Sequence, residues 1–173
     1  MRYHFLILLL LSFGLHSFAQ QFPVVPCKDV NGKTKELNLS ASAKPSVVFV
    51  QKKAKSGEMA ESWIDPLVQK FIRKSGMLDA MFDADLVFLA YLNQIEAGMV
   101  EKSTKKVKEE IPAELHSGSY FSTESPDAVE SIVLSGADSF IVVVSAEGRI
   151  LGSVQGKYTE EKMEMIEDWL NSN

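Results

Sequence analysis

The chain has 173 residues, of which 46% are hydrophobic and 24% are charged, and its formal net charge is −5. This length and composition are typical of one globular domain with a sizeable core. The acidic balance argues against a nucleic-acid partner, because no basic surplus exists to neutralise phosphates. The chain has one cysteine, Cys27, which excludes an intramolecular disulfide and a dithiol pair.

The first 19 residues are typical of a secretory signal peptide. A basic residue near the start precedes the apolar run 5–11, and residues 17–19 include the small side chains that a signal peptidase requires. The apolar stretch is shorter than the ~20 residues that a membrane-spanning helix needs. A lipoprotein signal is disfavoured because residues 24–26 lack the small side chain expected before the cysteine. We predict cleavage after Ala19, a single domain over residues 20–173, and a periplasmic or secreted protein without a membrane span.

The predicted mature chain has few side chains for metal or nucleophilic chemistry. Removing 19 of the 173 residues leaves 154, and losing Arg2 leaves 17 basic against 23 acidic residues, a charge of about −6. His116 is then the last remaining histidine, so a His-rich or Cys-His metal site would lack ligands. A Ser-His-Asp triad would lack the Gly-x-Ser-x-Gly elbow. We expect no metal and no cofactor.

Four segments have the character of β-strands. Residues 46–50 and 86–91 are short continuous apolar runs, which is typical of central strands that are covered on both faces. Residues 140–144 form a third such run, and a Glu-Gly turn connects them to residues 149–154. The turn between two β-rich runs predicts a hairpin.

Three helices are predicted between and after these strands. From residue 58 to about residue 75, apolar side chains recur every four positions. Pro66 lies inside this pattern, so either the helix kinks there or a shorter helix begins at Pro66. A second helix is predicted around residues 99–110, and a third follows Thr159, which is a favourable N-cap. Residues 111–126, rich in Ser and Thr, are predicted to form a mobile loop.

Three phrases of the sequence resemble the thioredoxin-like superfamily, in particular its exported thiol-disulfide reductases and their peroxiredoxin-like relatives. Residues 22–37 are similar to the opening hairpin of that branch, with a D-x-x-G-K turn. Residues 44–50 are similar to its first core strand, and residues 136–150 to its last hairpin. The resemblance covers nearly the whole predicted mature chain. It implies an α/β fold with a mixed sheet of about four to five core strands, flanked by helices and preceded by an N-terminal β-hairpin.

The functional residues of this family are missing. The family places a C-x-x-C motif at the start of the first long helix, and alignment on Pro66 puts Glu58 and Glu61 at the two cysteine positions. The family's cis-proline corresponds to Asp138. Because a cis bond before a residue other than proline costs ~2.5–4 kcal/mol, we predict a trans peptide there.

Two catalytic interpretations remain open, one for Glu58 and Glu61 and one for Cys27. Glu58 and Glu61 lie three residues apart on one helix face, so a carboxylate pair is physically feasible, although acids in a first turn ordinarily stabilise the helix dipole. Cys27 is the candidate nucleophile of a one-cysteine peroxidase or mixed-disulfide enzyme. It lies far from any predicted helix N-terminus, so an inert, partly buried thiol is the simpler interpretation.

The sequence therefore predicts an exported thioredoxin-fold protein that acts as a binding or accessory module rather than a disulfide oxidoreductase. The expected partner is a protein or peptide of the cell envelope. The cluster Lys52, Lys53 and Lys55 is predicted to form a solvent-exposed loop, and it is the candidate binding surface.

Overall fold

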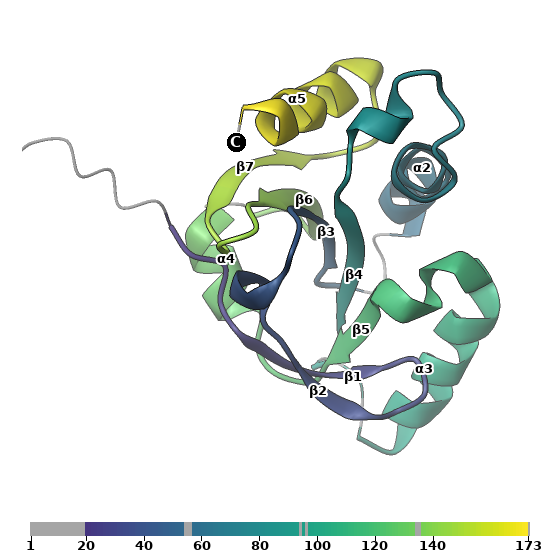
Figure 1. Cartoon of the computed structure of the whole chain (residues 1–173). Helices are drawn as coiled ribbons and strands as arrows, with labels where there is room; N and C mark the ends of the chain where they lie inside the picture. The colour runs from purple at the N-terminus through teal and green to yellow at the C-terminus, as the bar shows by residue number, and fades with distance from the viewer. Residues whose placement is uncertain (1–19, 54–56, 94, 96, 134–135, 173) are drawn as a thin grey trace, which may run out of the picture.

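The computed structural model describes residues 20–53, 57–93, 95, 97–133 and 136–172, so the predicted signal peptide lies outside the described residues. The described residues form a seven-stranded sheet in the order β2-β1-β5-β4-β3-β6-β7, with helices on both faces (Figure 1). The strands are β1 (Val25–Asp29), β2 (Thr34–Leu37), β3 (Ser46–Gln51), β4 (Asp85–Tyr91), β5 (Ser119–Ser122), β6 (Ser139–Val144) and β7 (Ile150–Gln155). The helices are α2 (Gly57–Leu67), α3 (Ala97–Glu110), α4 (Asp127–Val133) and α5 (Glu160–Asn171), with short helical turns η1 (Leu39–Ala41), η3 (Val68–Arg73), η4 (Asp79–Met81) and η5 (Ala113–Gly118).

The sheet is mixed, as predicted. Strand β4 pairs parallel with β3 on one side and with β5 on the other. Strand β6 pairs antiparallel with β3, and β7 pairs antiparallel with β6. The β1–β2 hairpin is antiparallel and joins the sheet through β5. The predicted α/β class, opening hairpin and last hairpin are confirmed, and the sheet has more strands than the four or five expected.

Strand β3 lies at the centre of the core. Its side chains alternate between the two faces, as the period of two in a strand requires. Val48 and Val50 belong to one hydrophobic cluster, which also contains Val129 of α4. Val47 and Phe49 belong to a second cluster on the other face, which we call the α2–α5 cluster because these two helices cover it. This two-sided burial explains why the strand is a continuous apolar run.

Trp63 of α2 anchors the α2–α5 cluster. Its side chain is fully buried, its indole N–H donates a hydrogen bond to the carbonyl oxygen of Gly156 at 2.9 Å, and its ring meets Tyr158 edge-on with centroids 5.2 Å apart. Trp169 of α5 packs against the same cluster over Gly152, where an added Cβ would lie 2.3 Å from the indole.

Helix α2 does not begin at Pro66, which lies inside it. From Val68, two residues after this proline, the backbone widens into a π-helix, η3, which ends at Arg73 and is followed by Lys74 in the left-handed conformation. Proline removes one intrahelical hydrogen bond, and departures from regular helix geometry are typical both at proline and at π-type turns.

The prediction of a loop over residues 111–126 is wrong. This segment contains η5 and then β5, a central strand that lies between β1 and β4. The next helix, α4, was also not predicted. Within the described residues, no helix is long and apolar enough to cross a membrane.

Candidate functional site

Three elements meet where the family resemblance places chemistry: the carboxyl end of β3, the first turn of α2 and the start of β6. Strand pairing sets Gln51 opposite Ser139, and the backbone N–H of Lys52 donates to the carbonyl oxygen of Asp138 at 2.9 Å. The site residues named from the sequence are therefore brought together in part. We call this region the β3-end site.

Lys52 is buried, so the prediction that it belongs to a solvent-exposed loop is wrong. Its side chain is 6% exposed and forms an ion pair with Glu130 of α4. The ammonium group also lies 5.9 Å from the centroid of the Phe140 ring. The paired carboxylate and the aromatic face stabilise a charge that burial alone would exclude. Lys52 thus ties α4 to the sheet and does not present a cation to a partner.

Lys53 is exposed, and its side chain points to Asp138, the acidic residue just before β6. Its ammonium group lies 2.6 Å from a carboxylate oxygen of Asp138, and this hydrogen bond raises the pKa of Lys53. The peptide bond that precedes Asp138 is trans, as are all the peptide bonds of the described residues. Lys55 lies outside the described residues.

Glu58, one of the two acids at the family's cysteine positions, is engaged by a lysine. The side chains of Glu58 and Glu61 are both exposed on α2. Glu58 pairs with Lys157 at 2.9 Å, and the hydrogen bond from that lysine lowers the pKa of Glu58. A general acid at neutral pH needs a raised pKa, so the direction of this shift disfavours acid–base work by Glu58.

Two further residues of the β3-end site were missed from the sequence. The hydroxyl of Ser139 donates to the sulfur of Met59 at 2.9 Å, which joins β6 to the first turn of α2. Glu130 reaches Lys52 across a separation of 78 residues. No local pattern marks either contact, because both depend on how distant segments pack.

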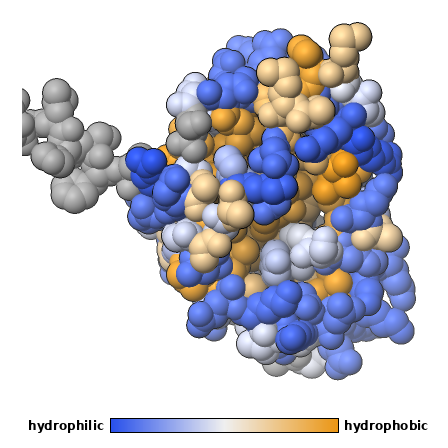
Figure 2. All heavy atoms as spheres, in the orientation of Figure 1, coloured by the Kyte–Doolittle hydropathy of each residue, from blue (hydrophilic) through white to orange (hydrophobic). Residues whose placement is uncertain are grey.

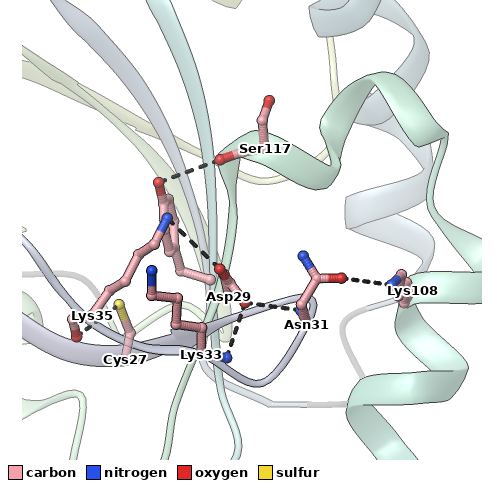
Figure 3. Close-up of polar contacts among 8 residues, drawn as sticks. Cys27, Asp29, Asn31, Lys33, Lys35, Lys108 and Ser117 are labelled. Carbon is pink, nitrogen blue, oxygen red and sulfur yellow. Dashed lines mark hydrogen bonds and ion pairs between the residues drawn. The ribbon is translucent and has the colours of Figure 1, made fainter.

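Cys27 lies on β1, outside the β3-end site. Cys27 is 5% exposed, and its thiol donates a long hydrogen bond of 3.6 Å to the carbonyl oxygen of Lys35 (Figure 3). Burial raises the pKa of Cys27, although a backbone hydrogen bond and the nearby Lys35 act in the opposite direction. A thiol whose pKa is raised is a weak nucleophile at neutral pH.

The described residues contain no group of three or more His, Cys, Asp or Glu side chains placed to hold a metal ion. The β3-end site contains two acid–base ion pairs and one hydroxyl–thioether contact, Lys52–Glu130, Lys53–Asp138 and Ser139–Met59. This arrangement connects β3, α2, α4 and β6.

No family model and no curated protein matches the chain. Solved structures do match it. The thioredoxin domain of a thiol-disulfide oxidoreductase from Bacteroides vulgatus is 14% identical, with a TM-score of 0.59 over 88% of this chain and 97% of that one. An exposed lipoprotein thioredoxin from Streptococcus pneumoniae is 12% identical, with a TM-score of 0.54 over 86% and 99% of the two chains. A member of the Sco family of cytochrome c oxidase assembly proteins is 15% identical, with a TM-score of 0.54 over 88% and 92%.

Identities this low establish a common architecture and carry no information on activity. The order of strands, the helices on both faces and these structural matches lead to one conclusion. The chain has the thioredoxin-like fold.

Proposed function

We propose that this chain is an exported thioredoxin-fold protein that binds a protein or peptide of the cell envelope and performs no dithiol redox chemistry. The observation that supports this most is the content of the β3-end site. Ion pairs and a hydroxyl–thioether contact occupy the region where the resemblance places two thiols. The one thiol of the chain is buried on β1.

The rival function is a one-cysteine peroxidase or mixed-disulfide enzyme that uses Cys27. Insulin-disulfide reduction and peroxide consumption separate the two, measured on the wild-type protein and on Cys27→Ser beside an active thioredoxin. We expect both proteins to stay at the uncatalysed rate, because burial raises the pKa of this thiol and no second cysteine can resolve a mixed disulfide. An activity that Cys27→Ser abolishes would overturn the non-redox proposal.

Export is tested separately. When the full chain is expressed in a bacterium with a secretory pathway, we expect it in the envelope or medium fraction with Gln20 as its first residue. Intact-mass spectrometry and N-terminal sequencing measure this directly. A chain that keeps residues 1–19 would contradict cleavage, and one whose mass shows lipid on Cys27 would support the lipoprotein alternative.

A further inference from the structure

A groove lies away from the β3-end site, between the β1–β2 hairpin, helix α3 and the end of β5. It encloses about 840 Å³, which is within the ~300–1,000 Å³ range of small-ligand sites. Figure 1 shows α3 beside the hairpin, and in Figure 2 the surface over α3, at the lower right, is mostly hydrophilic.

The floor of the groove is apolar. Val30 and Phe121 are buried, and Val100 of α3 packs against them. Cys27 also lines the cavity, but its side chain packs in the hydrophobic cluster that contains Val48 and Val129. An occupant therefore gains free energy by placing an apolar group here.

The hairpin wall of the groove is held in place by its own hydrogen bonds (Figure 3). A carboxylate oxygen of Asp29 accepts hydrogen bonds from the backbone N–H groups of Asn31 at 2.9 Å and Lys33 at 3.1 Å. The amide oxygen of Asn31 accepts a hydrogen bond from Lys108 of α3 at 2.8 Å. This last contact joins the two walls, so the groove is preorganised and a ligand has less ordering entropy to lose on binding.

Charges of both signs line the groove. Lys28, Lys105 and Lys108 form no ion pair within the part of the chain that the structure describes, and the same holds for Glu101 and Glu124. The ammonium group of Lys108 already donates to Asn31. Opposite charges that share one cavity without contacting each other are available to a ligand that carries both signs. A purely anionic ligand would instead face the repulsive glutamates, and a purely cationic ligand would face the repulsive lysines.

We propose that this groove binds a short peptide with free termini: its carboxylate meets Lys28 and Lys105, its ammonium group meets Glu101 and Glu124, and an apolar side chain lies on Val30, Val100 and Phe121. The walls also contain Thr34 and Thr104; the Thr104 hydroxyl donates to the carbonyl oxygen of Val100 at 3.0 Å and can still accept a hydrogen bond from a peptide N–H. The inference rests on the peptide-binding role proposed above and names its site and ligand class.

The test is a titration of the isotope-labelled, full-length protein with tri-leucine, followed by amide chemical shifts in NMR spectra. We expect saturable shifts centred on Val30, Val100 and Phe121. Tri-leucine that is acetylated and amidated at its ends lacks both charges and should bind at least fivefold more weakly. Decanoate, an apolar anion, should also bind more weakly than tri-leucine.

Two double variants test the contributions of the positive and the negative side chains to binding separately. Lys28→Gln with Lys105→Gln, and Glu101→Gln with Glu124→Gln, should each weaken tri-leucine binding about fivefold, which corresponds to about 1 kcal/mol for solvent-accessible ion pairs. The matched control, Lys102→Gln with Glu109→Gln, changes exposed charges on α3 that do not line the groove and should bind like the wild type.

Several outcomes would overturn the proposal: no saturable shifts, equal binding of the capped peptide or of decanoate, or groove variants that bind like the control. Shifts centred on Lys53 and Asp138 would also overturn the groove while supporting a peptide-binding role at the β3-end site. None of these results bears on the redox assays, so failure of the groove and failure of the non-redox function are distinguishable.

Discussion

Lys52 shows how one buried charge can hold several elements together. Its ion pair with Glu130 joins the end of β3 to α4, and its backbone N–H is bonded to the residue before β6. Lys52 is buried while Glu130 is 38% exposed, so loss of the carboxylate would leave the more buried charge without that partner.

We therefore expect Glu130→Gln to lower the free energy of unfolding by about 1–2 kcal/mol, less than for a fully buried pair because solvent reaches the carboxylate. Replacing the cation by an apolar side chain of similar length, Lys52→Met, should cost less than about 1 kcal/mol. Urea denaturation measures both. The control is Glu164→Gln, an exposed acid on α5, and a Glu130→Gln protein as stable as this control would contradict the role of the pair.

At the scale of the element, the sequence predicts those strands and helices whose apolar pattern is continuous. Strand β5 lacks such a pattern because two of its four residues are serines, although Ser119 and Ser122 are buried. Their hydroxyls donate to the carbonyl oxygens of Leu115 and Pro26, each at 2.8 Å, which offsets the cost of burial. A central strand built on such contacts cannot be distinguished from a polar loop by periodicity.

The β3-end site was predictable to a similar degree. The positions of Lys52, Lys53 and Asp138 follow from the strand pattern and the family resemblance, whereas their partners do not. Glu130 lies on a helix of only seven residues, which has too few turns to show an amphipathic pattern. The contact that decides the burial of Lys52 is therefore a property of the tertiary structure.

Two glycines provide a prediction about how elements pack. A Cβ added to Gly118, at the end of η5, would lie 2.3 Å from the carbonyl oxygen of Leu86 on β4, whereas one added to Gly98 on α3 would meet no atom within 4 Å. We expect Gly118→Ala to destabilise the protein by about 2 kcal/mol or more, because backbone must move. Gly98→Ala should be neutral or stabilise it by up to about 1 kcal/mol. Thermal unfolding of both variants measures this, and similar melting temperatures would contradict it.

For the molecule as a whole, paired surface acids set the response to low pH. Backbone N–H groups, first that of Lys33, lower the pKa of Asp29. Hydrogen bonds from Lys44 and Arg73 lower the pKa of Asp83 and Glu114, respectively. Because these groups have lower pKa values in the folded than in the unfolded chain, their contribution to stability is present above the ordinary values of 3.8 for Asp and 4.5 for Glu. It is lost as the pH falls through the folded values.

The melting temperature should thus fall as the pH is lowered from 6 to 3. The double variant Lys44→Gln with Arg73→Gln removes the cations beside Asp83 and Glu114. Its melting temperature should therefore fall less than that of the wild type over the same pH range. Calorimetry at each pH gives both curves. Parallel curves for the wild type and the variant would contradict a role for these two pairs in acid sensitivity.

The burial of Trp63 has a practical consequence for optical measurements. Both tryptophans of the chain, Trp63 and Trp169, belong to or pack against the α2–α5 cluster, whereas the floor of the groove is built from a different cluster. A fully buried indole should emit at shorter wavelength than one in water, so loss of this blue-shifted fluorescence would report disruption of the packing beneath α2 and α5. Emission should change little when the groove is filled. One spectroscopic signal would then follow global unfolding in every variant named above without interference from the ligand.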